Sequence, residues 1–182
     1  MMHSGKASSK MALCGILTAL SVIAMIIAGF MGVLTYAAPM IAGGVLILPV
    51  REYGKGTAFT MFAAVSLLGV MLIPDKEMAL FYTLLFGHYP IIQPLLNGIN
   101  RKFPRVLLKA LVFNGGTLLS VLLAKLVFAV PVFDSDHPVW LLTAGFVIAA
   151  NICFALYDKA LLGFYTIYDV RIAPLLHRFF QF

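Results

Sequence analysis

Residues 84–98 place two prolines and several polar side chains inside an apolar run, LLFGHYPIIQPLLNG. Proline has no backbone N–H, so in a helix Pro90 frees the carbonyl of Phe86, and Pro94 frees the carbonyl of Pro90. Inside a membrane a freed carbonyl needs a donor from neighbouring protein or from a wet cavity. Transporters use broken helices of this kind to offer backbone groups to a solute. The pattern therefore predicts a kinked or partly unwound span whose chemistry is hydrogen bonding.

Three polar side chains accompany the predicted break and are candidate substrate contacts: Tyr82, His88 and Tyr89. Under the transport interpretation they bind a solute beside the exposed carbonyls. Under the alternative interpretation the kink is structural, as proline kinks are common in membrane helices, and His88 hydrogen-bonds a neighbouring helix. The residues alone leave both interpretations open.

Two amides lie at matching depths in later apolar runs. Asn114, in FNGGT, and Asn151, in AANIC, are each about eight residues from one end of their run. They can therefore pair across a helix interface, an interaction typically worth about 1 kcal/mol in a membrane. The alternative is that both amides contact a substrate, and we retain them as candidate binding residues.

A lysine and an acidic motif complete the polar set. Lys125 lies about five residues inside its apolar run, where its ammonium can reach the surface, meet Glu77, Asp75 or Asp134, or contact an anionic solute. Asp158 and Lys159 are expected at the depth of Arg105 and Lys109. Together they predict a solvated belt of ion pairs.

Enzyme motifs are missing from the sequence. There is no G-x-x-x-x-G-K-[ST] phosphate loop, no H-E-x-x-H helix and no G-x-S-x-G elbow, and the seven acids fall near run ends or in loops. The net charge of +6 is spread between apolar runs, which argues against nucleic acid as a partner. Cys14 and Cys153 lie in apolar runs and are expected to pack without a disulfide or a metal. We expect no catalytic activity and no cofactor.

These polar residues must be positioned by membrane helices. Hydrophobic residues make up 62% of the 182 residues and charged residues only 11%, a balance outside the range of soluble domains. A span needs about 20 apolar residues. The chain is therefore expected to be all-α, a single polytopic membrane domain over residues 1–182 with six transmembrane helices at about 11–30, 33–50, 57–73, 78–98, 106–130 and 139–157.

The basic residues orient these spans. Cytoplasmic loops of membrane proteins accumulate Lys and Arg, and one side of the six-span layout receives eleven of the thirteen basic residues. Both termini are thus predicted to be cytoplasmic, in the cell membrane. After the last span, residues 160–182 are expected to form an interfacial tail with a short helix, because Ile172, Leu175, Leu176, Phe179 and Phe180 recur at helical spacing.

Two stripes of small residues predict faces where helices approach closely. The first, in residues 10–21, consists of Ala12, Gly15 and Ala19. The second, in residues 116–124, consists of Gly116, Ser120 and Ala124. Either stripe can pack within this bundle or against another membrane protein, and the pattern does not choose between these possibilities.

This layout resembles the substrate-binding S components of energy-coupling factor transporters, in which six helices in fewer than 200 residues have both ends in the cytoplasm. In that family a small-residue face of the first helix docks a transmembrane coupling subunit that works with an ATPase pair. Here the matching face is Ala12, Gly15 and Ala19, with glycine replacing an alanine. The resemblance implies capture of a vitamin-like solute near the outer side by helices four to six. Many members also have a substantial loop after the first helix, whereas about four residues are available here.

The chain is also similar to small bacterial membrane proteins without an assigned function. The shared stretches are MLIPDKEMALFYTLLFGHYPI, residues 71–91, and the N-x-x-F-x-x-Y-D pattern that ends at Asp158. Two hypotheses follow from the sequence. The chain is either the solute-binding subunit of an ATP-driven uptake system or a non-catalytic membrane scaffold, and membrane lipid surrounds it in both cases.

Overall fold

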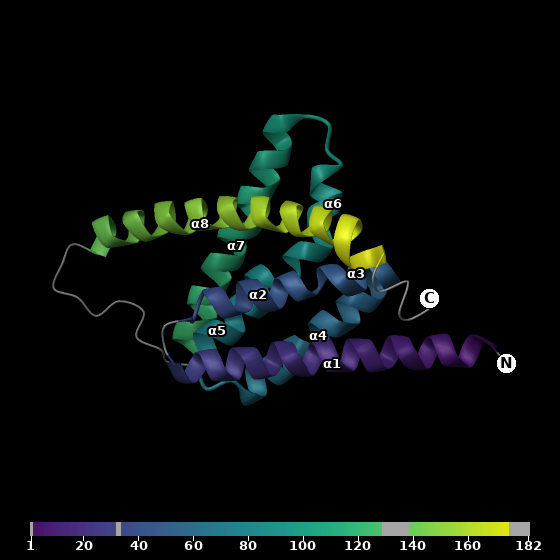
Figure 1. The fold of residues 1–182 in the computed structure, drawn as a ribbon. Coiled ribbons are helices and arrows are strands. Elements are labelled where there is room, and N and C mark those ends of the chain that lie inside the picture. Colours follow the sequence, from purple (N-terminus) through teal and green to yellow (C-terminus); the bar gives the residue numbers. More distant parts are fainter. Residues whose placement is uncertain (1, 32–33, 129–138, 175–182) are drawn as a thin grey trace.

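The computed structural model describes residues 2–31, 34–128 and 139–174, with side chains for residues 10–31, 34–127 and 144–174. Within these ranges every regular element is helical and no strand occurs. The elements are α1 (Met2–Met31), α2 (Ala37–Val45), α3 (Ile47–Tyr53), α4 (Lys55–Leu72), α5 (Lys76–Phe81), η1 (Tyr82–Phe86), α6 (Tyr89–Asn97), α7 (Lys102–Phe128), α8 (Val139–Ile167) and η2 (Tyr168–Ile172). The predicted all-α class is confirmed (Figure 1).

Five helical stretches are long and apolar enough to cross a membrane: Lys10–Met31, Lys55–Leu72, Lys76–Asn97, Lys102–Val127 and Ala144–Ile172. Their outer faces carry large exposed apolar side chains, such as Ile16, Leu126 and Ile152. Soluble monomers rarely expose so continuous an apolar surface, because its contact with water is unfavourable. The helical composition and this surface together indicate a multi-pass membrane protein.

The second predicted span, 33–50, corresponds to the shorter pair α2 and α3. The two helices meet at Leu46, whose N–H bonds to the Gly43 carbonyl, while the Val50 N–H donates to the Leu46 carbonyl. The pair ends at Gly54, where a φ of 83° is readily adopted only by glycine. At 1.5 Å per residue the pair extends over about 25 Å, slightly less than a bilayer core.

One end of the molecule is held by the turn before α5. Helix α4 stops at Ile73 because Pro74 follows it, and the Asp75 carboxylate then caps α5 by accepting the Met78 N–H at 3.1 Å. The same carboxylate accepts the Thr35 hydroxyl at 2.9 Å, and so joins this turn to the segment before α2. Lys76 Nζ in turn donates to the carbonyls of Val70 and Ile73 at the end of α4.

The opposite end gathers basic groups. Lys10 of α1 lies over the Tyr53 ring, 5.4 Å from its centroid, and Arg51 of α3 pairs with Asp169 of η2 at 2.7 Å. Figure 1 shows the start of α1, α3 and the last turns of α8 on the same side of the molecule. These contacts place the N-terminal helix, the α3–α4 turn and η2 at a common end.

The predicted break in the fourth span is confirmed. Residues 76–97 are divided into α5, the π-helical segment η1 and α6, with Gly87 and His88 between η1 and α6. The Gly87 N–H reaches the Tyr82 carbonyl at 2.7 Å, which closes the wide turn. A Cβ on Gly87 would collide with the Phe62 ring of α4 and with the Tyr82 carbonyl, so the break requires glycine.

The final helix differs from its predicted length. The span was expected to end at 157, but α8 continues to Ile167 and is followed directly by η2. Asp158 and Lys159 interrupt the apolar pattern without ending the helix, because Asp158 is buried among polar partners. No separate interfacial helix begins between 160 and 172, and residues 175–182 of the predicted tail lie outside the described residues.

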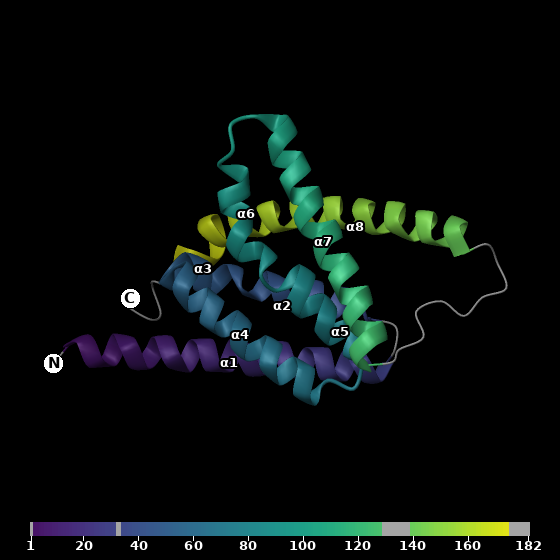
Figure 2. The same ribbon diagram turned by 180° about the vertical axis from the view of Figure 1, so that it is seen from behind.

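Two apolar clusters hold the helices together. One joins α1, α2, α4 and α5 around Met25, Leu46 and Val65; the other joins α3, η1, α6, α7 and α8 around Phe113, Phe154 and Leu161. Figure 2 shows α7 crossing α8, whose first half extends away from the other helices. The second half of α8 is therefore the part that the core anchors.

Candidate functional site

Both carbonyls that the prolines free are capped by tyrosines of α8. The Tyr165 hydroxyl donates to the Pro90 carbonyl at 2.6 Å, and the Tyr157 hydroxyl approaches the Phe86 carbonyl at 3.4 Å. Pro94 and Pro90 cannot supply these donors because they have no N–H. The backbone of the break is therefore satisfied by protein.

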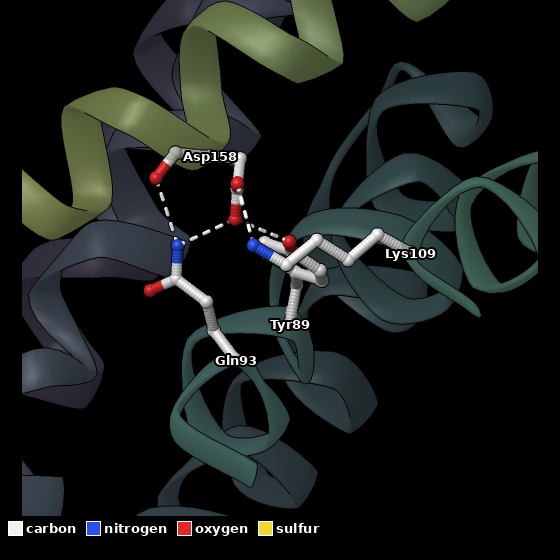
Figure 3. A network of polar contacts seen from close by, with 4 residues as sticks. All are labelled: Tyr89, Gln93, Lys109 and Asp158. Carbon is white, nitrogen blue, oxygen red and sulfur yellow. Dashed lines mark hydrogen bonds and ion pairs between the residues drawn. The ribbon is translucent and has the colours of Figure 1, made fainter. Parts of the chain in front are cut away.

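A second polar cluster joins α6, α7 and α8 through Asp158 (Figure 3). Its carboxylate accepts the Tyr89 hydroxyl at 2.5 Å and Gln93 Nε2 at 2.7 Å on one oxygen, and Lys109 Nζ at 2.7 Å on the other. Gln93 Nε2 also donates to the Asp158 carbonyl at 2.8 Å. Tyr89, a predicted substrate contact, is thus bonded to another helix.

The predicted solvated belt of ion pairs is wrong at this position. Lys109 and Asp158 do pair, but their side chains are only 11% and 16% exposed, and Gln93 beside them is fully buried. A buried carboxylate persists only when its partners compensate for lost hydration. Asp158 has such partners on both oxygens, so the cluster fastens three helices together.

The predicted pairing of the two asparagines is confirmed. Asn114 Nδ2 donates to Asn151 Oδ1, and Asn151 Nδ2 donates to Asn114 Oδ1, each at 3.0 Å. Each amide also donates to the carbonyl one turn before it, that of Ala110 or Val147. The pair links α7 to α8.

Two other predicted substrate contacts, Tyr82 and His88, lie beside the apolar cluster that surrounds Met25, Leu46 and Val65. Tyr82 is only 1% exposed and packs against Phe62 of α4, and its hydroxyl has no hydrogen-bond partner within the described residues. His88 is half-buried and meets the edge of the same Phe62 ring, with 6.1 Å between centroids. Both residues therefore line the interface between the fourth span and α4.

Lys125 lies apart from the other candidates. It is exposed near the end of α7. Within the residues whose side chains are described, it makes no ion pair, and this includes its expected partners Asp75 and Glu77. Its third expected partner, Asp134, lies outside the described residues. Its neighbour Ala124 lines a cleft between α5, α7 and α8.

A cleft opens between α5, α7 and α8 at the end opposite the basic groups. Its main part encloses about 360 Å³ and continues into a second chamber of about 230 Å³, which shares Tyr36, Phe81, Thr117 and Phe146 with it. Asn114, Thr117 and Ser120 supply polar groups along α7, and Glu77 supplies a carboxylate from α5. The remaining wall is apolar and aromatic, which is the usual composition of small-molecule sites.

Sequence reasoning identified one cleft residue directly. Asn114 lines the cleft, and Asn151 hydrogen-bonds Asn114. The lining residues Tyr36, Glu77 and Thr117 were not identified from the sequence. A signal was present, because Asn114, Thr117, Val121 and Ala124 recur at helical spacing and share one face of α7. For Tyr36 and Glu77 there was no such signal, since they reach the cleft from segments distant in sequence.

The two small-residue stripes behave differently. In α7, Gly116 lies against the Leu84 carbonyl of η1, and Ser120 and Ala124 are buried, so the second stripe packs inside this chain. In α1, Ala12, Gly15 and Ala19 are all exposed, and a Cβ on Gly15 would meet no atom within 4 Å. The first stripe is therefore available to lipid or to another membrane protein.

Comparison with protein-family models, with curated proteins and with solved structures finds no match for the chain.

Proposed function

We propose that this protein is the solute-binding membrane subunit of an uptake transporter, and that the cleft between α5, α7 and α8 receives the solute. The observation that carries the proposal is the cleft itself, an aromatic cavity with an amide, hydroxyls and one carboxylate. It lies among the fourth, fifth and sixth helices, where the resemblance to S components implies substrate capture.

The lining suggests the kind of solute. Three aromatic rings, Tyr36, Phe81 and Phe146, favour a flat or apolar molecule, and the Glu77 carboxylate favours a cationic or hydrogen-bond-donating group on it. Asn114 of α7 adds an amide to the lining. A vitamin-sized molecule with a positively charged or amino-bearing ring has this combination of properties.

The proposed transporter crosses the membrane six times with both termini in the cytoplasm. The α2–α3 pair, second in chain order, adds a crossing to the five long apolar helices. The concentration of Lys and Arg on one side of the six-span layout supports placing both termini in the cytoplasm. The exposed face of Ala12, Gly15 and Ala19 would then dock the coupling subunit that brings the ATPase pair.

A scaffold function is the second candidate, and one observation favours it. Four polar side chains near the break make hydrogen bonds between helices: Tyr89, Gln93, Tyr157 and Tyr165. A protein that only assembles other membrane proteins needs no more than this. The cleft is the feature that such a function leaves unexplained.

A cavity-filling variant tests the transport proposal. Thr117→Trp places a large ring where both chambers meet, and Leu119→Trp puts the same ring on an exposed face of α7 outside the cleft. We expect mass spectrometry of organic extracts to find a small molecule copurifying with the wild type and with Leu119→Trp, and to find it lost from Thr117→Trp. Gel filtration in detergent verifies that both variants fold.

The same purification from native membranes distinguishes the two functions. Transport predicts that an ATPase pair accompanies the wild-type protein, and that a bound compound is present. If folded wild-type protein carries no compound, or if Thr117→Trp retains as much compound as Leu119→Trp, the cleft is not a solute site and the scaffold function is favoured.

A further inference from the structure

Another cavity lies between the start of α7 and the middle of α8, and Phe154 is the one lining residue that it shares with the second chamber of the proposed solute cleft. It encloses about 530 Å³, and three basic side chains line it: Arg105, Lys109 and Lys159. Asp158 is the one acidic residue on the wall. The cavity is therefore positively charged, unlike the cleft, whose charged group is a carboxylate.

One of the three basic groups is already neutralised. Lys109 pairs with Asp158, and both carboxylate oxygens of Asp158 are occupied by Tyr89, Gln93 and Lys109. Among residues 10–31, 34–127 and 144–174, no ion pair joins Arg105 or Lys159 to an acid. The cavity thus presents two positive charges that the described part of the chain does not balance.

The start of α7 adds to this excess of positive charge. A helix N-terminus is partially positive and is stabilised by anions, yet the first turn of α7 carries no acid and includes Lys102 and Arg105. Basic side chains at this end of a helix are electrostatically unfavourable unless an anion lies between them. A bound anion would stabilise both Arg105 and the first turn of α7.

The rim of the cavity is apolar. Val106 and Leu162 are exposed beside Arg105 and Lys159, and Ala155 and Phe154 continue the same wall along α8. In a membrane these side chains face acyl chains. A ligand that fits both parts has a negatively charged head for the cavity and hydrocarbon tails for the rim, which is the composition of an anionic phospholipid.

We propose that Arg105 and Lys159 bind the phosphate of an anionic phospholipid, with Asn97 beside the headgroup and Val106 and Leu162 against its acyl chains. The site is separate from the solute cleft and does not depend on the transport function. By holding α6, α7 and α8 around one headgroup, the lipid supports the same three helices that Asp158 joins.

The test measures lipid binding to the purified full-length protein. Native mass spectrometry in detergent follows the binding of phosphatidylglycerol and phosphatidylcholine to wild type and to Arg105→Gln/Lys159→Gln. At about 1 kcal/mol per basic residue, the double variant is expected to weaken phosphatidylglycerol binding about thirtyfold, and each single variant about fivefold. Binding of phosphatidylcholine should be weak and unchanged.

A matched control separates a site from general surface charge. Lys55→Gln/Arg171→Gln also removes two positive charges, from exposed residues outside the cavity, and should leave phosphatidylglycerol binding within twofold of wild type. Equal losses in the two double variants would overturn the proposal. If the cavity double variant does not fold, the two single variants decide the question, and unchanged binding in both overturns it.

A competition arm distinguishes a lipid from a free anion. Inorganic phosphate at millimolar concentration should not displace phosphatidylglycerol, because it lacks the acyl chains that contact the rim. Displacement by phosphate alone would assign the cavity to a soluble anion and overturn the lipid proposal. Retention of phosphatidylglycerol in the presence of phosphate supports it.

Discussion

Tyr165 and Tyr157 replace, from a different helix, the backbone donors that Pro94 and Pro90 lack. In lipid an unsatisfied carbonyl is costly, because no water is present to hydrogen-bond it. The Tyr165 hydroxyl, at 2.6 Å from the Pro90 oxygen, provides the shorter of the two contacts. The stability of the break therefore depends on single hydroxyl groups of α8.

A double-mutant cycle tests this dependence. Tyr165→Phe leaves the Pro90 carbonyl buried without a donor and is expected to lower the free energy of unfolding by about 1 to 3 kcal/mol. Pro94→Ala restores an N–H one turn after Pro90, so the same Tyr165→Phe change should cost much less in that background. Unfolding in mixed micelles by SDS titration measures all four proteins. An equal loss in both backgrounds would mean that the hydroxyl does not substitute for the missing amide.

At the scale of helices, the π-helical segment η1 is packed between two glycines of other elements. Gly43 of α2 lies against the Phe86 carbonyl, and Gly116 of α7 lies against the Leu84 carbonyl, each so close that a Cβ would overlap the oxygen. Small residues allow this approach of backbones. The irregular segment is thus enclosed by α2, α7 and α8.

The paired glycines of α7 give a matched test of this packing. Gly116→Ala forces α7 away from η1 and is expected to lower the free energy of unfolding by about 1 to 3 kcal/mol. Gly115→Ala, one residue earlier, meets no atom within 4 Å and should be neutral or slightly stabilising because alanine favours helix. Thermal unfolding in detergent compares the two variants. Similar melting temperatures would contradict close packing of α7 on η1.

Sequence reasoning located the elements better than their partners. The break near Pro90 was predictable because proline acts locally on the carbonyl four residues before it. The Asn114–Asn151 pair was predictable from equal depth in two spans. The donors from Tyr157 and Tyr165 were not, because they depend on the rotation and register of α8 against α6, which no local pattern specifies.

The error at Asp158 has the same origin. A charged residue after an apolar run normally marks the end of a span, so both the boundary at 157 and the solvated ion pairs were reasonable expectations. Three partners from two other helices bury the carboxylate, and α8 continues past it. Only the tertiary arrangement distinguishes an internal acid of this kind from a loop residue.

For the whole molecule, the topology depends on whether the α2–α3 pair crosses the membrane. Five helices are individually long enough, and a crossing by the α2–α3 pair makes six and places both termini on one side. The contacts at the two ends, Thr35 with Asp75 and Arg51 with Asp169, are consistent with a pair that runs from one end to the other.

Cysteine labelling of intact cells tests this crossing. In a background with Cys14 and Cys153 replaced by alanine, we expect a membrane-impermeant maleimide to label Leu34→Cys from outside, and Lys55→Cys only after lysis. Phe103→Cys, at an exposed position, is likewise expected to be labelled only after lysis. Labelling of residues 34 and 55 from the same side would show that α2 and α3 return to the surface they left. The termini would then lie on opposite sides.

The two capping tyrosines also restrict how the length of this chain can change. Tyr157 and Tyr165 meet carbonyls four residues apart, at Phe86 of η1 and Pro90 of α6, and each residue inserted into a helix rotates everything after it by about 100°. An insertion between them would turn one hydroxyl away from the carbonyl oxygen that it contacts. The eight-residue spacing of the two tyrosines is therefore fixed by these two hydrogen bonds. Between residues 144 and 150 most side chains of α8 are exposed, so we expect a change of length there to disturb less packing.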